Sequence, residues 1–140
     1  MSSQVKKVDD IPYIALQHAR KAVEIAKGLL DKLLTHGLSD PFYESLWKLI
    51  LELETASSLI AIYLDIEETP KGSKVSIYNP FNKDEVRNCI NEAVKSLLDL
   101  NSLLQLKTVN PRVLKEVYRR IWRVRDALHK IYEVRYYRRW

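Results

Sequence analysis

The sequence predicts an all-α protein: one antiparallel four-helix bundle that occupies residues 1–140 as a single domain. Three observations support this fold class. In four long segments, apolar residues recur at alternating spacings of four and three, the pattern of a helix with one buried face. The chain has only 3 Gly and 5 Pro, too few turn residues for an all-β sandwich or barrel. With 46% hydrophobic and 29% charged residues, it has enough apolar side chains for a core of ordinary size.

The first two helices are expected at residues 11–35 and 40–66. Gly37 is a natural C-terminal stop for the first helix, and Ser39 offers an N-cap for the second, with Pro41 in its first turn. The short link between them predicts antiparallel neighbours. The apolar faces comprise Ala15, Ala19, Ala22, Ala26, Leu29 and Leu33 in the first helix, and Phe42, Leu46, Leu49, Leu53, Ala56, Ile60 and Tyr63 in the second.

The last two helices are expected at residues 83–107 and 111–137. The third opens with Asn82 and, three residues later, Glu85, a spacing that resembles a capping box. The fourth opens with Asn110 and Pro111. Their apolar faces comprise Val86, Ile90, Ala93, Leu97, Leu100 and Leu104, and then Leu114, Val117, Ile121, Val124, Leu128 and Ile131.

Residues 67–82 are expected to form the one long crossover loop, because they hold two prolines and a glycine and lack a helical period. Two interpretations of this loop stay open: a strap that runs along the bundle, or a segment that binds a partner or acts as a lid. Residues 1–10 and 138–140 are expected to be frayed.

Composition excludes several classes of site. One Cys rules out a disulfide framework, and with only 3 scattered His it also rules out a closed zinc site. No Gly-rich phosphate loop, nucleophile-elbow serine or paired Glu-x-x-His motif occurs, so we expect no metal and no cofactor. The most apolar stretch, residues 46–64, contains Lys48, Glu52 and Glu54, and the chain opens without an apolar signal core. We therefore expect a cytoplasmic protein that does not engage a membrane.

Charge is distributed unevenly along the chain, which has a net charge of +5. Residues 112–140 hold ten Lys or Arg and three acids, whereas residues 40–68 hold seven acids and one Lys. One interpretation is that the second and fourth helices, or two copies of the protein, face each other with complementary charge. The other is a cationic surface for phosphates, aided by the aromatic residues of the last segment.

A second series at spacings of four and three follows the core face of the last helix by one residue: Lys115, Tyr118, Trp122, Arg125, His129, Tyr132 and Tyr136. Basic residues interleaved with aromatic rings are typical of surfaces that bind single-stranded nucleic acid. The residues predicted to contact nucleic acid are Arg119, Arg120, Trp122, Tyr132, Arg135, Tyr136, Arg138, Arg139 and Trp140.

Arg125 and His129 are four residues apart, so they project from the same side of the last helix. A histidine can transfer protons near neutral pH and an arginine can hold a phosphate, a minimal set for metal-independent RNA cleavage. The alternative interpretation is a surface salt-bridge set, with His129 between Asp126 and Glu133. The same Asp-x-x-His-x-x-x-Glu triple could bind a metal, but no second ligand motif accompanies it.

The basic and histidine residues on the last long helix of a small bundle resemble the HEPN superfamily, whose ribonuclease members carry an arginine, four to six residues and then a histidine. Arg123 has the matching count before His129 but is followed by Val124, whereas Arg125 has the polar follower Asp126 but only three intervening residues. The resemblance implies a helical bundle, often a dimer and often paired with a nucleotidyltransferase. It also implies catalytic roles for Arg123 or Arg125 and for His129.

We therefore expect a small HEPN-like bundle that contacts RNA through its basic last helix and that acts as a metal-independent ribonuclease if the Arg and His pair is functional. The alternative is a non-catalytic module whose basic helix docks on an acidic surface, either in a homodimer or on a partner protein. DNA binding by the same face ranks last, because no helix-turn-helix is evident. The sequence leaves open whether the protein is an enzyme.

Overall fold

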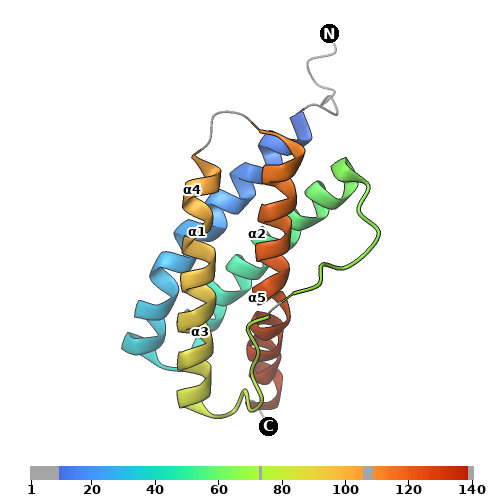
Figure 1. Cartoon of the computed structure of the whole chain (residues 1–140). Helices are drawn as coiled ribbons and strands as arrows, with labels where there is room; N and C mark the ends of the chain where they lie inside the picture. Colours follow the sequence, from blue (N-terminus) through green and yellow to red (C-terminus); the bar gives the residue numbers. More distant parts are fainter. Residues whose placement is uncertain (1–9, 73, 106–108, 139–140) are drawn as a thin grey trace.

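The computed structural model describes residues 10–72, 74–105 and 109–138 and has the predicted all-α fold. Its long helices are α1 (Ile11–His36), α2 (Asp40–Leu64), α3 (Lys83–Leu98) and α5 (Pro111–Arg138), with the short α4 (Leu100–Leu104) continuing α3. Each long helix contacts two neighbours: α1 packs on α2 and α3, and α5 packs on α2 and α3. Figure 1 shows that each of these neighbours runs antiparallel to the helix it touches.

The helix ends reflect local sequence. Gly37 closes α1 at φ +67°, and its N–H donates to the carbonyl of Leu33, as expected of a C-terminal glycine. At the start of α3 the Asn82 side chain accepts from the Glu85 N–H at 3.0 Å, while the Glu85 carboxylate accepts from the Asn79 N–H at 2.7 Å. The capping pair therefore forms, with its second half displaced to Asn79. Ser39 is the residue before α2, but its side chain makes no capping hydrogen bond.

Four predicted boundaries differ from the structure. The first helix extends one residue further, to His36. The second helix ends at Leu64 rather than residue 66, because Asp65 adopts a left-handed conformation at φ 54°. The third helix is interrupted at Asp99 and ends at Leu104; the last two residues predicted for it lie outside the described part of the chain. Arg138, expected to be frayed, belongs to α5, whereas residues 1–9 and 139–140 lie outside the described residues.

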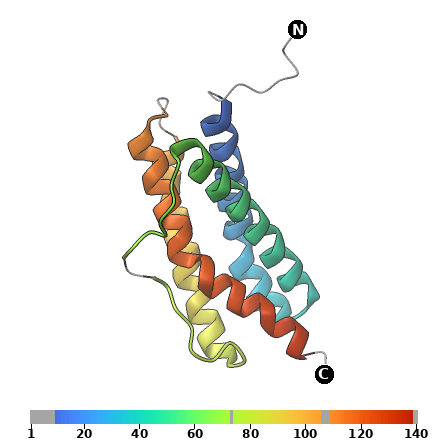
Figure 2. The ribbon, with the colours of Figure 1, turned by 90° about the vertical axis from the view of Figure 1, so that its right-hand side faces the viewer.

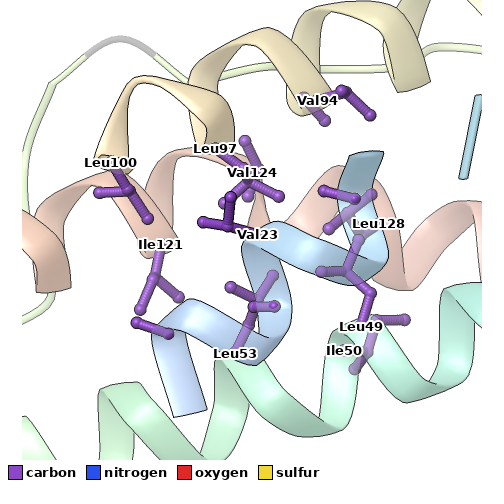
Figure 3. Packing of buried hydrophobic residues seen from close by; sticks show 14 of the residues in the cluster. Val23, Leu49, Ile50, Leu53, Val94, Leu97, Leu100, Ile121, Val124 and Leu128 are labelled. Atoms are coloured by element: carbon purple, nitrogen blue, oxygen red, sulfur yellow. The ribbon is translucent and has the colours of Figure 1, made fainter. Parts of the chain in front are cut away.

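The core fills the space between the four long helices. Figure 3 shows Val23 of α1, Leu53 of α2, Leu97 of α3 and Ile121 and Leu128 of α5 converging there, and all five are at most 2% exposed. Figure 2 shows that α5 bends along its length. Its first half reaches the end of α3 and its second half lies along α2, as the ion pairs described below indicate.

The connection from α2 to α3, residues 65–82, is named the crossover strap here. It runs from one end of the bundle to the other, and Figure 2 shows that its first part passes beside the first half of α5 before it reaches the start of α3. The Val75 N–H donates to the carbonyl of Arg123 at 2.9 Å, Lys74 lies 3.6 Å from Asp126, and Ile77 is 6% exposed within the core. The middle of the strap is therefore attached to α5 at Lys74 and Val75 and to the core at Ile77, in agreement with the interpretation of this loop as a strap.

Candidate nucleic-acid interface

The basic residues of α5 separate onto two sides of the helix. The side that turns toward solvent and the strap carries Arg112, Lys115, Arg119, Arg123 and Lys130, all exposed, and is named the basic face. Arg125, His129, Tyr132 and Arg135 are half-buried and lie toward α2. This division follows from helical geometry, because each residue turns the helix by about 100°.

The basic face adjoins a hollow of about 210 Å³ between α5 and the strap, named the basic cleft. It is lined by Pro70, Lys71, Gly72, Lys74, Glu116, Arg119, Arg120, Trp122 and Arg123. Five of these side chains are cationic and one is a carboxylate. A shallower depression lined by Pro111, Arg112, Lys115, Glu116 and Arg119 continues it along α5. Positive charge concentrated in a recess raises the local concentration of anions.

Glu116 binds two of the cleft's arginines. Its Oε1 accepts from Arg119 at 2.8 Å and from Arg120 at 3.1 Å. The hydrogen bond from Arg119 is the largest cause that lowers the pKa of the Glu116 carboxyl, burial opposes it, and Arg120 adds to the lowering. Arg120 also lies 3.7 Å from Asp99, at the break between α3 and α4. The guanidinium groups of Arg119 and Arg120 thus already converge on one oxyanion, which is how arginines hold phosphates.

Arg125 and His129 meet at one carboxylate of α2. Arg125 Nε donates to Glu54 Oε1 at 2.6 Å, and His129 Nε2 lies 3.1 Å from the same oxygen. Their predicted proximity is therefore observed, with Glu54 as a third member that the sequence did not single out. Arg123 is not part of this group, because it lies in the basic cleft, six residues and about 120° around the helix from His129.

The aromatic residues predicted on this helix are mostly engaged by neighbours. Arg125 lies over the Trp122 ring at 4.7 Å, and Tyr132 stacks on Trp47 of α2 with ring centroids 4.9 Å apart. Arg135 donates to the Tyr132 hydroxyl at 3.1 Å and lies 3.9 Å from Asp40. Trp47 keeps 41% of its surface exposed. An exposed indole backed by a second ring is a platform on which a base can stack.

The interpretation in which α2 and α5 face each other with opposite charge is realised within one chain, through the ion pairs Glu54–Arg125 and Asp40–Arg135 and the contact of Glu54 with His129. The alternative interpretation of His129 is a surface salt-bridge set between Asp126 and Glu133, with Arg125 as its neighbour. His129 and Arg125 do share a carboxylate, but it is that of Glu54, and Asp126 is paired with Lys74 and Arg125.

Four of the residues predicted to contact nucleic acid lie at the end of the chain. Tyr136 and Arg138 belong to the last turns of α5, and Arg139 and Trp140 lie outside the described residues. Sequence reasoning also missed Lys71 and Lys74 in the cleft. The sequence feature that could have indicated these residues is the pair of lysines on either side of Gly72, in a loop for which partner binding was one of two open interpretations.

The other candidate chemistries find no support in the part of the chain that the structure describes. Residues 10–72, 74–105 and 109–138 contain no group of three or more His, Cys, Asp or Glu placed to hold a metal ion. Cys89, the free cysteine, is buried. No helix among the described residues is long and apolar enough to cross a membrane.

Comparison of the chain with family models, curated proteins and solved structures finds no match.

Proposed function

We propose that the protein binds RNA through the basic cleft and the adjoining basic face of α5. The observation that carries the proposal is the convergence of Lys71, Lys74, Arg119, Arg120 and Arg123 on one hollow with a single carboxylate. Phosphate contacts of this kind supply most of the affinity in sequence-independent nucleic-acid binding.

Exposed aromatic residues favour RNA with unpaired bases over a DNA duplex. Trp122 borders the cleft, whereas Trp47 with Tyr132 forms a partly exposed stack on the side of α5 that turns toward α2. Unpaired bases stack on such rings, whereas the bases of a duplex are already stacked on one another. The sequence also lacks an evident helix-turn-helix motif that would read a DNA groove.

Salt dependence and charge removal test RNA binding. The logarithm of the affinity for a single-stranded RNA should fall linearly with the logarithm of salt concentration, with a slope of about −0.7 per phosphate contacted. The double variant Arg119→Ala/Arg123→Ala should weaken binding and lower the magnitude of the slope. Lys21→Ala, an exposed lysine of α1, is the matched control. Affinity that is independent of salt, or equal in both variants, would contradict the proposal.

RNA cleavage is a second activity that the Arg125, His129 and Glu54 group favours, and it requires the strand to reach the side of α5 that turns toward α2, outside the basic cleft. In this scheme His129 transfers the proton of the attacking or leaving oxygen, and Arg125 stabilises the charge that develops on the phosphate. Glu54 positions both groups, since it contacts each of them. The expected result is cleavage in the presence of EDTA that is lost in His129→Ala and retained in His36→Ala. Cleavage that survives His129→Ala would exclude this group.

The alternative function, docking of basic α5 on an acidic protein surface, draws on the same charges. Asp40 and Glu54 of α2 already pair with α5 within the chain, so a partner would have to supply other acidic groups. This function predicts a discrete complex or dimer that dissociates when Arg119, Arg120 and Arg123 are replaced by Glu. Sedimentation that shows a monomer for both the wild type and the Glu variant, with no complex with a partner protein, would count against this docking function.

A further inference from the structure

The basic cleft has two walls that come from distant parts of the sequence. One wall is the basic face of α5, and the other is the strap, which contributes Lys71 and Lys74. The strap is held in place beside the cleft by the hydrogen bond from Val75 to the carbonyl of Arg123 and by the buried Ile77. The cations of the cleft therefore surround a ligand from two sides, which a single flat helix face could not do.

The size of the cleft suits a small group. Its volume of about 210 Å³ is below the roughly 300–1,000 Å³ typical of pockets that enclose a drug-sized ligand. A phosphate and the sugar attached to it fit a recess of this size, whereas a strand several nucleotides long does not. A longer strand would leave the recess along the shallower depression at Arg112 and Lys115.

The charge of the cleft suits an anion with more than one negative charge. Five cationic side chains and only one carboxylate line it. An internal phosphodiester carries a single charge and offers two free oxygens. A terminal phosphate carries about −1.5 to −2 charges near neutral pH and offers three strong acceptor oxygens. Arg119 and Arg120 already share one carboxylate oxygen of Glu116, so the guanidinium groups are oriented to share an oxyanion.

We infer that the basic cleft binds a terminal phosphate, the monoester group at the end of an RNA strand or on a free nucleotide, in preference to an internal phosphodiester. For the RNA source the inference rests on the proposed function, whereas for the nucleotide source it does not. Arg119 and Arg120 donate to the phosphate oxygens from α5, and Lys71 and Lys74 neutralise it from the strap. Glu116 competes with the phosphate for the two arginines, and Asp99 and Asp126 compete more weakly for Arg120 and Lys74, from which they lie 3.7 and 3.6 Å away.

The test compares three fluorescent RNA oligonucleotides of one sequence that end in a 5′-phosphate, in a 3′-phosphate or in hydroxyl groups only, with 5′-AMP titrated separately by calorimetry. We expect one phosphorylated end to bind at least tenfold tighter than the hydroxyl ends. The variant Lys71→Ala/Lys74→Ala should lose this preference, and Lys83→Ala, an exposed lysine at the start of α3, should retain it. Glu116→Gln should increase the preference, because it removes the competing charge.

The possible results distinguish failure of the terminal-phosphate inference from failure of the proposed RNA binding. Equal affinity for all three oligonucleotides, or a preference that persists in the strap variant, overturns the terminal-phosphate inference while RNA binding stands. Binding of 5′-AMP that is lost in the strap variant, without binding of any oligonucleotide, supports the inference with a nucleotide as ligand and removes the RNA function. Absence of binding to all four ligands overturns both.

Discussion

Removal of the Glu54 carboxylate should weaken the contact between α2 and α5 by an amount that the geometry sets. Glu54 Oε1 lies 2.6 Å from Arg125 Nε and 3.1 Å from His129 Nε2, and these side chains are 30–33% exposed. Buried hydrogen bonds to charged groups contribute roughly 1.5–3 kcal/mol each, but exposed ion pairs contribute about 0–1 kcal/mol. With this partial screening by solvent, each bond contributes about 0.5–1 kcal/mol, so Glu54→Ala should lower the free energy of unfolding by about 1–2 kcal/mol.

Urea denaturation followed by circular dichroism measures this loss. With a denaturant slope of about 2 kcal/mol per molar urea, the midpoint should fall by roughly 0.5–1 M. A double-mutant cycle with Arg125→Ala should give a coupling of about 0.5–1 kcal/mol between the two positions. Glu44→Ala, an exposed glutamate of the same helix, is the control and should change stability little. A Glu54→Ala midpoint equal to that of the control, or an additive cycle, would refute the argument that Glu54 joins the two helices.

Three further predictions follow from burial and charge. Leu128 is fully buried, so Leu128→Ala should lower the free energy of unfolding by about 2–5 kcal/mol. Leu34 is 57% exposed, so Leu34→Ala should change the free energy of unfolding by less than about 0.5 kcal/mol. Equal losses of stability in urea denaturation would contradict the observed core. The hydrogen bond from arginine that lowers the pKa of Glu116 below its usual 4.5 stabilises the protein above pH 4.5, and this contribution is lost as pH falls through the lowered value. The stability difference between wild type and Glu116→Gln should therefore shrink below pH 4.5, and a difference that grows there would show the sign to be wrong. Burial, with smaller contributions from nearby glutamates, raises the pKa of the Cys89 thiol to about 11, so a thiol reagent at pH 8 should modify Cys89 only when urea unfolds the chain, and rapid modification of the folded protein would argue against burial.

The helices were predictable because their signals are local. The apolar spacing of four and three records which face is buried, and Gly37 and Asn82 mark two ends through their own backbone and side-chain chemistry. The break at Asp99 was not predictable from this spacing. Leu97 and Leu100 on either side of it are both buried, so the apolar pattern continues across a change in backbone hydrogen bonding.

The candidate site was predictable only on the side that belongs to α5. Periodicity brings Arg125 and His129 together within one helix, but Glu54 reaches them from 71 and 75 residues away. Lys71 and Lys74 likewise reach the cleft only because the strap passes along α5. Such long-range contacts depend on how the elements are arranged, and the pattern within each element does not record them.

The topology of the strap links ligand binding to the assembly of the bundle. The chain consists of two helical hairpins, α1 with α2 and α3 with α5, and the strap is the covalent link between them. The cleft combines lysines of that link with arginines of the second hairpin, so it exists only when the strap lies against α5. An anion bound there favours the packed position of the strap by mass action. Phosphate ligands should therefore stabilise the attachment of this covalent link to the second hairpin.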